Sequence, residues 1–491
     1  MDSAETWYMF RHAVLREAAY QLLLPSARAS LHESALELLE KAGAEPIELA
    51  DHAHRAREAR GPTFTTRLER TERQHLFNAA RQAERSHRIG DAEGLLRRLE
   101  GVAGADDAAQ MEVARLRTRL TLMSGRGPEA VDAANRLLAA AEASGKEDLL
   151  ARARFEAGRT FVDMADTARA RGLLQLAAAH FRKDQSRELC QCLGSLSTAT
   201  WFSQSAELAL PICDEALALA RQSGDADAAC GTSINRVNML SGLRRVQEAR
   251  DELERARLLL PKAGPARAVM FEMTAGILEF YALRRDQALH HYTRALNMAR
   301  EFGMQSEVAR ALVNLASLDL PGVTPRVALE RQAEATRIAS ECGDLRLALY
   351  ALQGEAEALA RIRDYETAAQ RLQTARWYAQ TLGLAAQAQI VQLGRASMLL
   401  AIPGRDDALQ ESLQALQECS PHVETALAWI ATASEVAVHY RQTNEANNAR
   451  AWAARAFEVA ASFAGIWQDA QRHLQPLLDL QPAGVRPPDT P

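Results

Sequence analysis

A repeat with a period of 39 or 40 residues limits this chain to one class of architecture. Five segments in its central part each end in a glycine, at Gly224, Gly264, Gly303, Gly343 and Gly383. The spacings between them are 40, 39, 40 and 40 residues. A period of this length is typical of arrays in which each unit is one supersecondary element that stacks on its neighbours.

Two alanines seven residues apart precede each of these glycines, and the second alanine lies eight residues before the glycine. Residues seven apart lie on the same face of a helix, where small side chains let a neighbouring helix approach closely. A ninth pair, Ala130 and Leu137, replaces the second alanine by leucine. Eight pairs keep both alanines: Ala170/Ala177, Ala209/Ala216, Ala249/Ala256, Ala288/Ala295, Ala328/Ala335, Ala368/Ala375, Ala408/Ala415 and Ala449/Ala456.

Each repeat contains two amphipathic helices. In residues 286–303, apolar side chains recur three, four and seven positions apart, and the closing glycine is expected as a left-handed C-cap. A helix of similar length precedes it at 266–283, and another at 345–362 precedes the helix that ends at Gly383. A helix pair cannot bury its apolar face alone, so the pairs must stack. The sequence predicts an all-α fold, a right-handed α–α superhelix, and explains why only 5% of the residues are aromatic.

The repeat at 350–379, with Asp364, Tyr365, Ala368 and Ala375, resembles the long-helix variety of tetratricopeptide repeat. We expect tetratricopeptide-like helix pairs over 64–465, clearest over 146–465, after a helical junction segment at 1–60. A capping helix is expected at 466–480 and a disordered, proline-rich tail at 481–491.

The junction segment carries a second resemblance. Residues 8–32 read YMFRHAVLREAAYQLLLPSARASLH, and 48–52 read ELADH. This resembles the region between the nucleotide-binding core and the repeats of bacterial signal-transduction ATPases of the STAND type, which are fused to LuxR-type regulators, cyclases or kinases. The resemblance implies a coupling role in signal transduction or transcriptional regulation, with contacts expected from Phe10, Arg11, His12, Arg16 and Tyr20.

The chain lacks the ATPase signature itself. Gly145-Lys146 has neither the earlier glycine nor the following hydroxyl of a phosphate-binding loop. No other catalytic motif is present, so we predict a non-enzymatic chain without a cofactor. An alternative is a fragment of an ATP-hydrolysing STAND protein whose phosphate-binding loop is missing from this sequence.

The net charge, the apolar stretches and the cysteines indicate which compartment and which classes of partner to expect. The net charge of −5 gives no basic surface for nucleic acid, and the apolar stretches are too interrupted for a membrane helix. No signal peptide is visible, and the six cysteines lack the density of a disulfide scaffold. These features predict a cytoplasmic protein with reduced thiols, of unspecified oligomeric state.

Several possible sites are better interpreted as structural. His52/His54 and Cys190/Cys192 have a spacing of two, which suits neither a helical metal pair nor a zinc loop, so we predict no metal site. His290 and His291 are interpreted as a surface pair, and scattered acidic residues as solvated helix faces. The tryptophans expected in the core are Trp201, Trp377, Trp429, Trp452 and Trp467.

The predicted function is binding in a concave groove lined by the first helix of each pair. Amides on these helices can bind a peptide backbone through both donor and acceptor, although Asn235 and Asn314 can equally bond a neighbouring helix. The expected ligand is a protein or peptide, and a separate or fused ATPase domain is a further expected partner. The alternative is a small-molecule or peptide inducer that switches a regulator. The candidate groove residues are Asn235, Arg236, Asn238, Asn314, Gln353 and Gln392.

Overall fold

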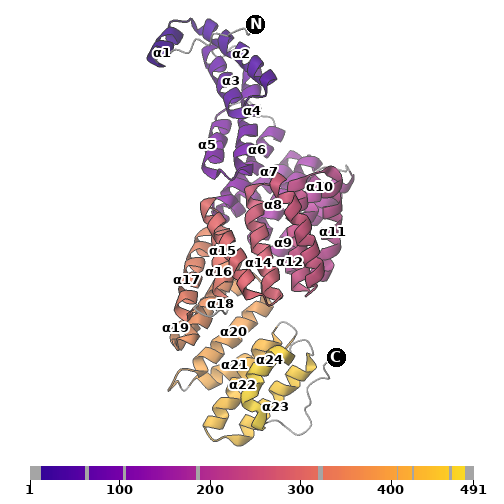
Figure 1. Ribbon diagram of the computed structural model, residues 1–491, viewed down its shortest axis with the longest axis vertical. Coiled ribbons are helices and arrows are strands. Elements are labelled where there is room, and N and C mark those ends of the chain that lie inside the picture. The colour runs from indigo at the N-terminus through magenta and orange to yellow at the C-terminus, as the bar shows by residue number, and fades with distance from the viewer. Residues whose placement is uncertain are drawn as a thin grey trace. The chain divides into compact units, whose positions relative to one another are not determined.

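The described part of the chain is helical throughout. Its 24 α-helices and the absence of any strand from this part confirm the all-α prediction. Consecutive helices pack as pairs joined by short turns, which gives a tetratricopeptide-like solenoid (Figure 1). The computed structural model describes residues 13–60, 66–102, 107–183, 188–318, 324–405, 407–422, 425–463 and 467–480.

The chain forms two compact units, of which the first contains described residues up to Ser124 together with Glu129–Thr160 and Leu176–His180. Its core is built around the fully buried Leu76 and Leu116. Its helices are α1 (Ala13–Gln21), α2 (Pro25–Ala42), α3 (Pro46–Arg60), α4 (Thr66–Arg85), α5 (Ile89–Glu100), α6 (Asp107–Met123), and most of α7 (Gly127–Ser144) and α8 (Glu147–Asp163).

The second unit contains Gly125–Pro128, Phe161–Gln175 and the described residues from Phe181 onward. Three large apolar clusters follow one another along it. Its helices are α9 (Thr167–Lys183), α10 (Glu188–Ser203), α11 (Ala206–Ser223), α12 (Ala226–Gly242), α13 (Val246–Leu259), α14 (Pro265–Tyr281), α15 (Arg285–Glu301), α16 (Gln305–Ala316), α17 (Pro325–Cys342), α18 (Leu345–Arg361), α19 (Tyr365–Thr381), α20 (Ala385–Leu400), α21 (Ala408–Glu418), α22 (Ala426–Gln442), α23 (Ala446–Ser462) and α24 (Trp467–Leu474).

The paired alanines lie in the core, as their spacing predicts. All sixteen are buried, and the most exposed of them, Ala328, has only 6% of its surface accessible. The related pair Ala130 and Leu137 is also buried. Each pair lies on a second helix of a repeat, which explains the close packing without large side chains.

The closing glycines behave as expected with one exception. Gly224, Gly303, Gly343 and Gly383 have φ between 66° and 74°, in the left-handed region. The prediction for Gly264 is wrong, because its φ is −70° and it is the N-cap residue of α14. A short 3-10 turn at Leu260–Lys262 ends the preceding helix there instead.

Two first helices carry a glycine because a side chain of a neighbouring second helix occupies the place of a Cβ. A Cβ on Gly276 of α14 would overlap the ring of Tyr292 on the paired α15, and one on Gly354 of α18 would overlap the amide of Gln332 on α17, in the preceding pair. These glycines therefore allow a close approach within one pair and between two successive pairs. The analogous Gly394 has only ordinary contacts.

The C-terminal part of the second unit ends on a helix and a 3-10 segment, Gln475–Leu480. Leu474 and Leu477 are buried in the cluster formed with α22 and α23, so this segment covers the last pair. Residues 464–466 and the predicted tail at 481–491 lie outside the described residues.

The prediction of buried tryptophans is correct only in part. Trp429 is buried, and Trp201 and Trp452 are half-buried. Trp377 is 57% exposed, which overturns the prediction for this residue, because it lies on the solvent face of α19 while Tyr378 packs inward. The side chain of Trp467 lies outside the described part.

Candidate functional site

Of the five residues predicted to make junction contacts, Tyr20 is the one whose side chain the structure describes. Its hydroxyl lies 2.9 Å from Nε2 of His32, whose Nδ1 lies 3.0 Å from Nδ1 of His52. This chain of hydrogen bonds joins α1, α2 and α3. Burial lowers the pKa of His32, and the nearby His52 and Arg55 lower it further. Phe10, Arg11 and His12 lie outside the described residues, as does the side chain of Arg16.

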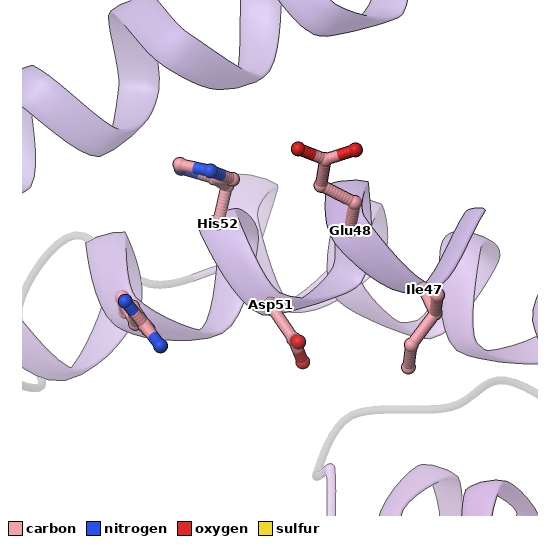
Figure 2. Close-up of a pocket in the computed structure, with 5 residues that line it drawn as sticks. Ile47, Glu48, Asp51 and His52 are labelled. Carbon is pink, nitrogen blue, oxygen red and sulfur yellow. The ribbon is translucent and has the colours of Figure 1, made fainter. Parts of the chain in front are cut away.

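A hollow of about 280 Å³ lies beside this chain of hydrogen bonds. Figure 2 shows Glu48 and His52 on one side of α3 and Asp51 on the other. Asp51 is engaged by Arg98 of α5 at 2.7 Å. The Asp51 carboxylate is thus paired, and the hollow offers polar contacts. The described lining residues are Ile47, Glu48, Asp51, His52 and Arg55.

The histidines set aside as metal ligands have structural partners. His54 lies 2.9 Å from Glu72 of α4, and Arg57 contacts the second oxygen of the same carboxylate. Within the described ranges, no three His, Cys, Asp or Glu side chains form a metal-binding group. His291 is not a free surface residue, because its Nδ1 lies 2.7 Å from Glu272.

Two of the predicted groove amides lie on α12. The side chain of Asn235 donates a hydrogen bond to Thr198 of α10, so it joins two neighbouring first helices. Asn238 lies one turn further along the same face, and its buried Oδ1 has no hydrogen-bond partner among the described residues.

Two further predicted amides lie between other first helices. Asn314 of α16 donates to the sulfur of Met273 of α14 at 3.1 Å, and Gln353 of α18 accepts from Gln387 of α20 at 3.0 Å. With Asn235, they form a row of amides along the contacts between first helices. Their role in binding stays a prediction.

The other two predicted residues face the second helices instead. Arg236 contacts Asp214 of α11 at 2.7 Å, and Gln392 donates to Glu418 of α21. The structure therefore does not bring all six residues to one surface. Helical periodicity separates Arg236 from Asn235 by about 100° around the helix axis.

A continuous polar stripe runs along α18. Arg346, Tyr350, Gln353 and Glu357 follow one another at intervals of four, three and four residues, so they share one face. On α16, Arg310 and Asn314 form a similar stripe. We call the surface made by these stripes, with Asn235 and Asn238 of α12, the first-helix face.

Arg346 joins distant parts of the second unit. Its Nη2 donates a hydrogen bond to the carbonyl oxygen of Ala165, in the turn between α8 and α9. Its guanidinium carbon lies 4.5 Å from the ring centroid of Phe202 of α10, and Phe202 stacks on Trp201. Phe202 is 45% exposed. An arginine and two aromatic rings thus meet on one accessible surface.

Ala165 has a left-handed backbone, with φ of 67°. This conformation is uncommon for a residue other than glycine. It recurs at the turns inside other helix pairs, so it belongs to the repeat and is no special strain of this site. Among the described residues, the other non-glycine residues with this conformation are His87, Arg244, Leu283, Arg363 and Asn444.

Two exposed side chains of the α18 stripe, Tyr350 and Glu357, are partly desolvated by the protein around them. Tyr350 is 44% exposed and Glu357 is also exposed, yet desolvation raises the pKa of both side chains. On α22, exposed Glu435 behaves in the same way. An exposed group loses part of its hydration where protein atoms stand close around it.

Arg310 is neutralised whereas Arg346 is not. Glu307, 3.9 Å away, raises the pKa of Arg310, and Asp344 and Asp163 add to this effect. For Arg346, desolvation is the largest influence and its pKa is lowered. In the described part of the chain, no carboxylate lies within ion-pair distance of Arg346.

Sequence reasoning missed a set of buried carboxylates. Glu156, Glu252 and Glu355 are each at most 2% exposed, which contradicts the interpretation of acidic residues as solvated. Each contacts an arginine; Glu355, for example, lies 2.9 Å from Arg371. An acidic residue inside an otherwise apolar stripe is the signal that could have identified them.

Comparisons with known proteins place the fold. No protein-family model matches the chain, and no curated protein matches it. A Rap protein complexed with competence and sporulation factor is similar with a TM-score of 0.56 and 16% identity, over 74% of this chain and 100% of that one.

Two other solved structures are similar over large parts of the chain. A STAND protein with a tetratricopeptide repeat sensor from Pyrococcus horikoshii has a TM-score of 0.46 and 12% identity, over 82% of this chain and 74% of that one. The apo quorum sensor NprR from B. thuringiensis has a TM-score of 0.44 and 15% identity, over 60% and 82%. At these identities, likeness concerns the fold alone.

None of the described helices is both long and apolar enough to cross a lipid bilayer.

Proposed function

We propose that this chain is a non-enzymatic interaction and sensor module that binds a protein or peptide across its first-helix face. The observation that carries the proposal is the convergence of α10, α18 and the α8–α9 turn around Arg346. Arginine and aromatic side chains that share a partly dehydrated surface are typical of the residues that dominate binding energy.

The fold supports the same conclusion. The Rap protein with a TM-score of 0.56 was solved with competence and sporulation factor bound, so a chain of this fold accommodates a ligand. In the present chain, the row of amides at Asn235, Asn314 and Gln353 would suit an extended backbone, because an amide offers both donor and acceptor.

Site-specific photo-crosslinking tests this proposal. A photoreactive phenylalanine analogue replaces Tyr350 on the first-helix face, or Trp377 on the second helix of the same pair. The two side chains are 44% and 57% exposed, so they are matched in accessibility. We expect a specific adduct with protein or peptide from Tyr350 in extracts of the source cells, and none from Trp377. Equal labelling at both positions would contradict the proposal.

The proposal includes the absence of catalysis. Purified chain should not hydrolyse ATP or release inorganic phosphate above the level of a buffer control. Turnover that follows the protein through successive columns would overturn this part and favour the ATP-hydrolysing alternative.

A coupling role for the junction is a second component, favoured by the hydrogen bonds from Tyr20 through His32 to His52. We propose that this segment contacts a separate or fused STAND-type ATPase, and that ligand on the first-helix face shifts this contact by population shift. Pull-down should recover an ATPase chain with the native protein and lose it with Tyr20→Ala or Phe10→Ala. Recovery that is unaffected by both changes would count against the coupling role.

A further inference from the structure

Arg346 is a half-buried cation that forms no ion pair with a carboxylate of the described residues. Several half-buried or buried guanidiniums contact carboxylates, as Arg119 contacts Glu84 and Arg236 contacts Asp214. Arg346, like the half-buried Arg331, contacts a backbone carbonyl instead, and it also has an aromatic face as a partner. Neither partner carries a negative charge. Desolvation lowers the pKa of Arg346 and outweighs the nearby Tyr350 and Asp344, which raise it, so a bound anion would stabilise this cation.

The neighbouring acidic groups have contacts of their own. Glu307 lies 3.9 Å from Arg310. The carboxylate of Asp344 accepts a hydrogen bond from the backbone N–H of Leu347, as the N-cap of α18. Among the described residues, neither carboxylate forms an ion pair with Arg346, although Asp344 favours its charged form through space.

The free donors of Arg346 lie beside a second donor. The hydrogen bond to Ala165 uses Nη2, which leaves Nε and Nη1 for a ligand. Tyr350 lies one turn along the same face, and its side chain is 44% exposed. Arg346 is in the first turn of α18, where the helix dipole also favours negative charge.

We propose that Arg346 and Tyr350 bind a carboxylate of a peptide ligand, with an adjacent apolar residue of the peptide on Phe202 and Trp201. A carboxylate matches the two remaining donors of a guanidinium and the phenol. The stacked rings of Phe202 and Trp201 supply the neighbouring apolar surface. This inference rests on the proposed function and names the chemistry of its ligand.

The carboxylate can come from the C-terminus of a peptide or from an Asp or Glu side chain. A hexapeptide array immobilised through the N-terminus separates these sources. Each sequence is present as the free acid and as the C-terminal amide, and each acidic residue is also replaced by its amide. Binding of the purified full chain to the array is then measured.

Native protein should bind a subset of sequences about tenfold or more tightly when the recognised carboxylate is present, as expected for a charge-assisted hydrogen bond. Arg346→Gln should abolish this preference while binding of the neutral peptides persists. Tyr350→Phe should reduce it several-fold. Arg337→Gln is the control, since Arg337 is an exposed residue of a second helix, paired with Glu341.

Two different outcomes would contradict these ideas separately. Binding of the peptides with equal affinity for acid and amide forms, unchanged in Arg346→Gln, would refute the carboxylate site and leave the proposed function standing. The absence of binding to any peptide would refute the peptide-binding function and the carboxylate site together. If Arg346→Gln fails to fold, as circular dichroism would show, Tyr350→Phe decides.

Discussion

The Nη2 atom of Arg346 donates a hydrogen bond over 3.3 Å to the carbonyl oxygen of Ala165, although 181 residues separate them in the sequence. Close by, a Cβ added to Gly343 would lie 2.6 Å from Cδ of Pro128. Both contacts lie within the second unit. They tie α18 to segments near the start of that unit, so a ligand at Arg346 acts where distant repeats meet.

The first prediction concerns Gly276, the glycine of α14 that packs against Tyr292 of α15. Gly276→Ala should lower the free energy of unfolding by about 1–3 kcal/mol, because its Cβ overlaps the Tyr292 ring. Gly172→Ala is the control: it lies inside α9, with nothing near its Cβ position. That change should stabilise by about 0.5–1 kcal/mol. Chemical denaturation measures both, and equal effects would contradict the packing.

The alanine pairs give the second prediction, in helix α23. Ala456→Leu should destabilise by about 1–3 kcal/mol, because Ala456 is fully buried and has no room for three further carbons. Ala451→Leu in the same helix is exposed and should change stability by less than about 0.5 kcal/mol. Calorimetry of the two variants checks this difference. Similar melting temperatures would mean that the pairs do not form the close contact between helices.

Glu156 gives a prediction on pH. Burial would raise the pKa of its carboxyl, but Arg159, Arg119 and Arg115 outweigh burial and lower the pKa below the ordinary value of 4.5. A lowered pKa stabilises the fold above the unfolded value and loses that stabilisation as pH falls through the folded value. Melting temperatures of the native chain should therefore fall as the pH decreases below about 4.5.

The variant Glu156→Gln isolates this contribution. It should be less stable at neutral pH by about 3–5 kcal/mol, as expected when one partner of a buried ion pair is removed. Its melting temperature should also depend less on pH in the acidic range. A pH profile parallel to that of the native chain would show that Glu156 is not held ionised by the three arginines.

The six cysteines give the fourth prediction. All are free and buried, and burial raises the pKa of Cys192 and of Cys213 to about 12. Since the thiolate is the reactive form, a thiol reagent near pH 8 should label none of them quickly in the native chain. In denaturing guanidinium chloride, all six should react. Rapid labelling of a native thiol would contradict its burial.

The repeat architecture could be predicted from the sequence because its signal is local. The alanine spacing and the closing glycines each express the geometry of one helix and its end. At Gly264 the same pattern failed, since Pro261 and Pro265 end one helix early and start the next.

The candidate site could be predicted only in part. Asn235 and Gln353 were identifiable as polar residues of first helices. The contact of Arg346 with Ala165 was not, because it depends on the small rotations between successive pairs, which add up over many repeats. The sequence contains the stripe from Arg346 to Glu357, yet nothing in it indicates that Phe202 would lie against this arginine.

Hydrogen–deuterium exchange with a bound peptide from the array tests the central claim most directly. Ligand that covers the first-helix face and Phe202 should slow exchange in α10, α12, α16 and α18, and leave the second helices α11, α17 and α19 nearly unchanged. Protection confined to the second helices, or absent from α10 and α18, would contradict the assignment of the first-helix face as the binding surface.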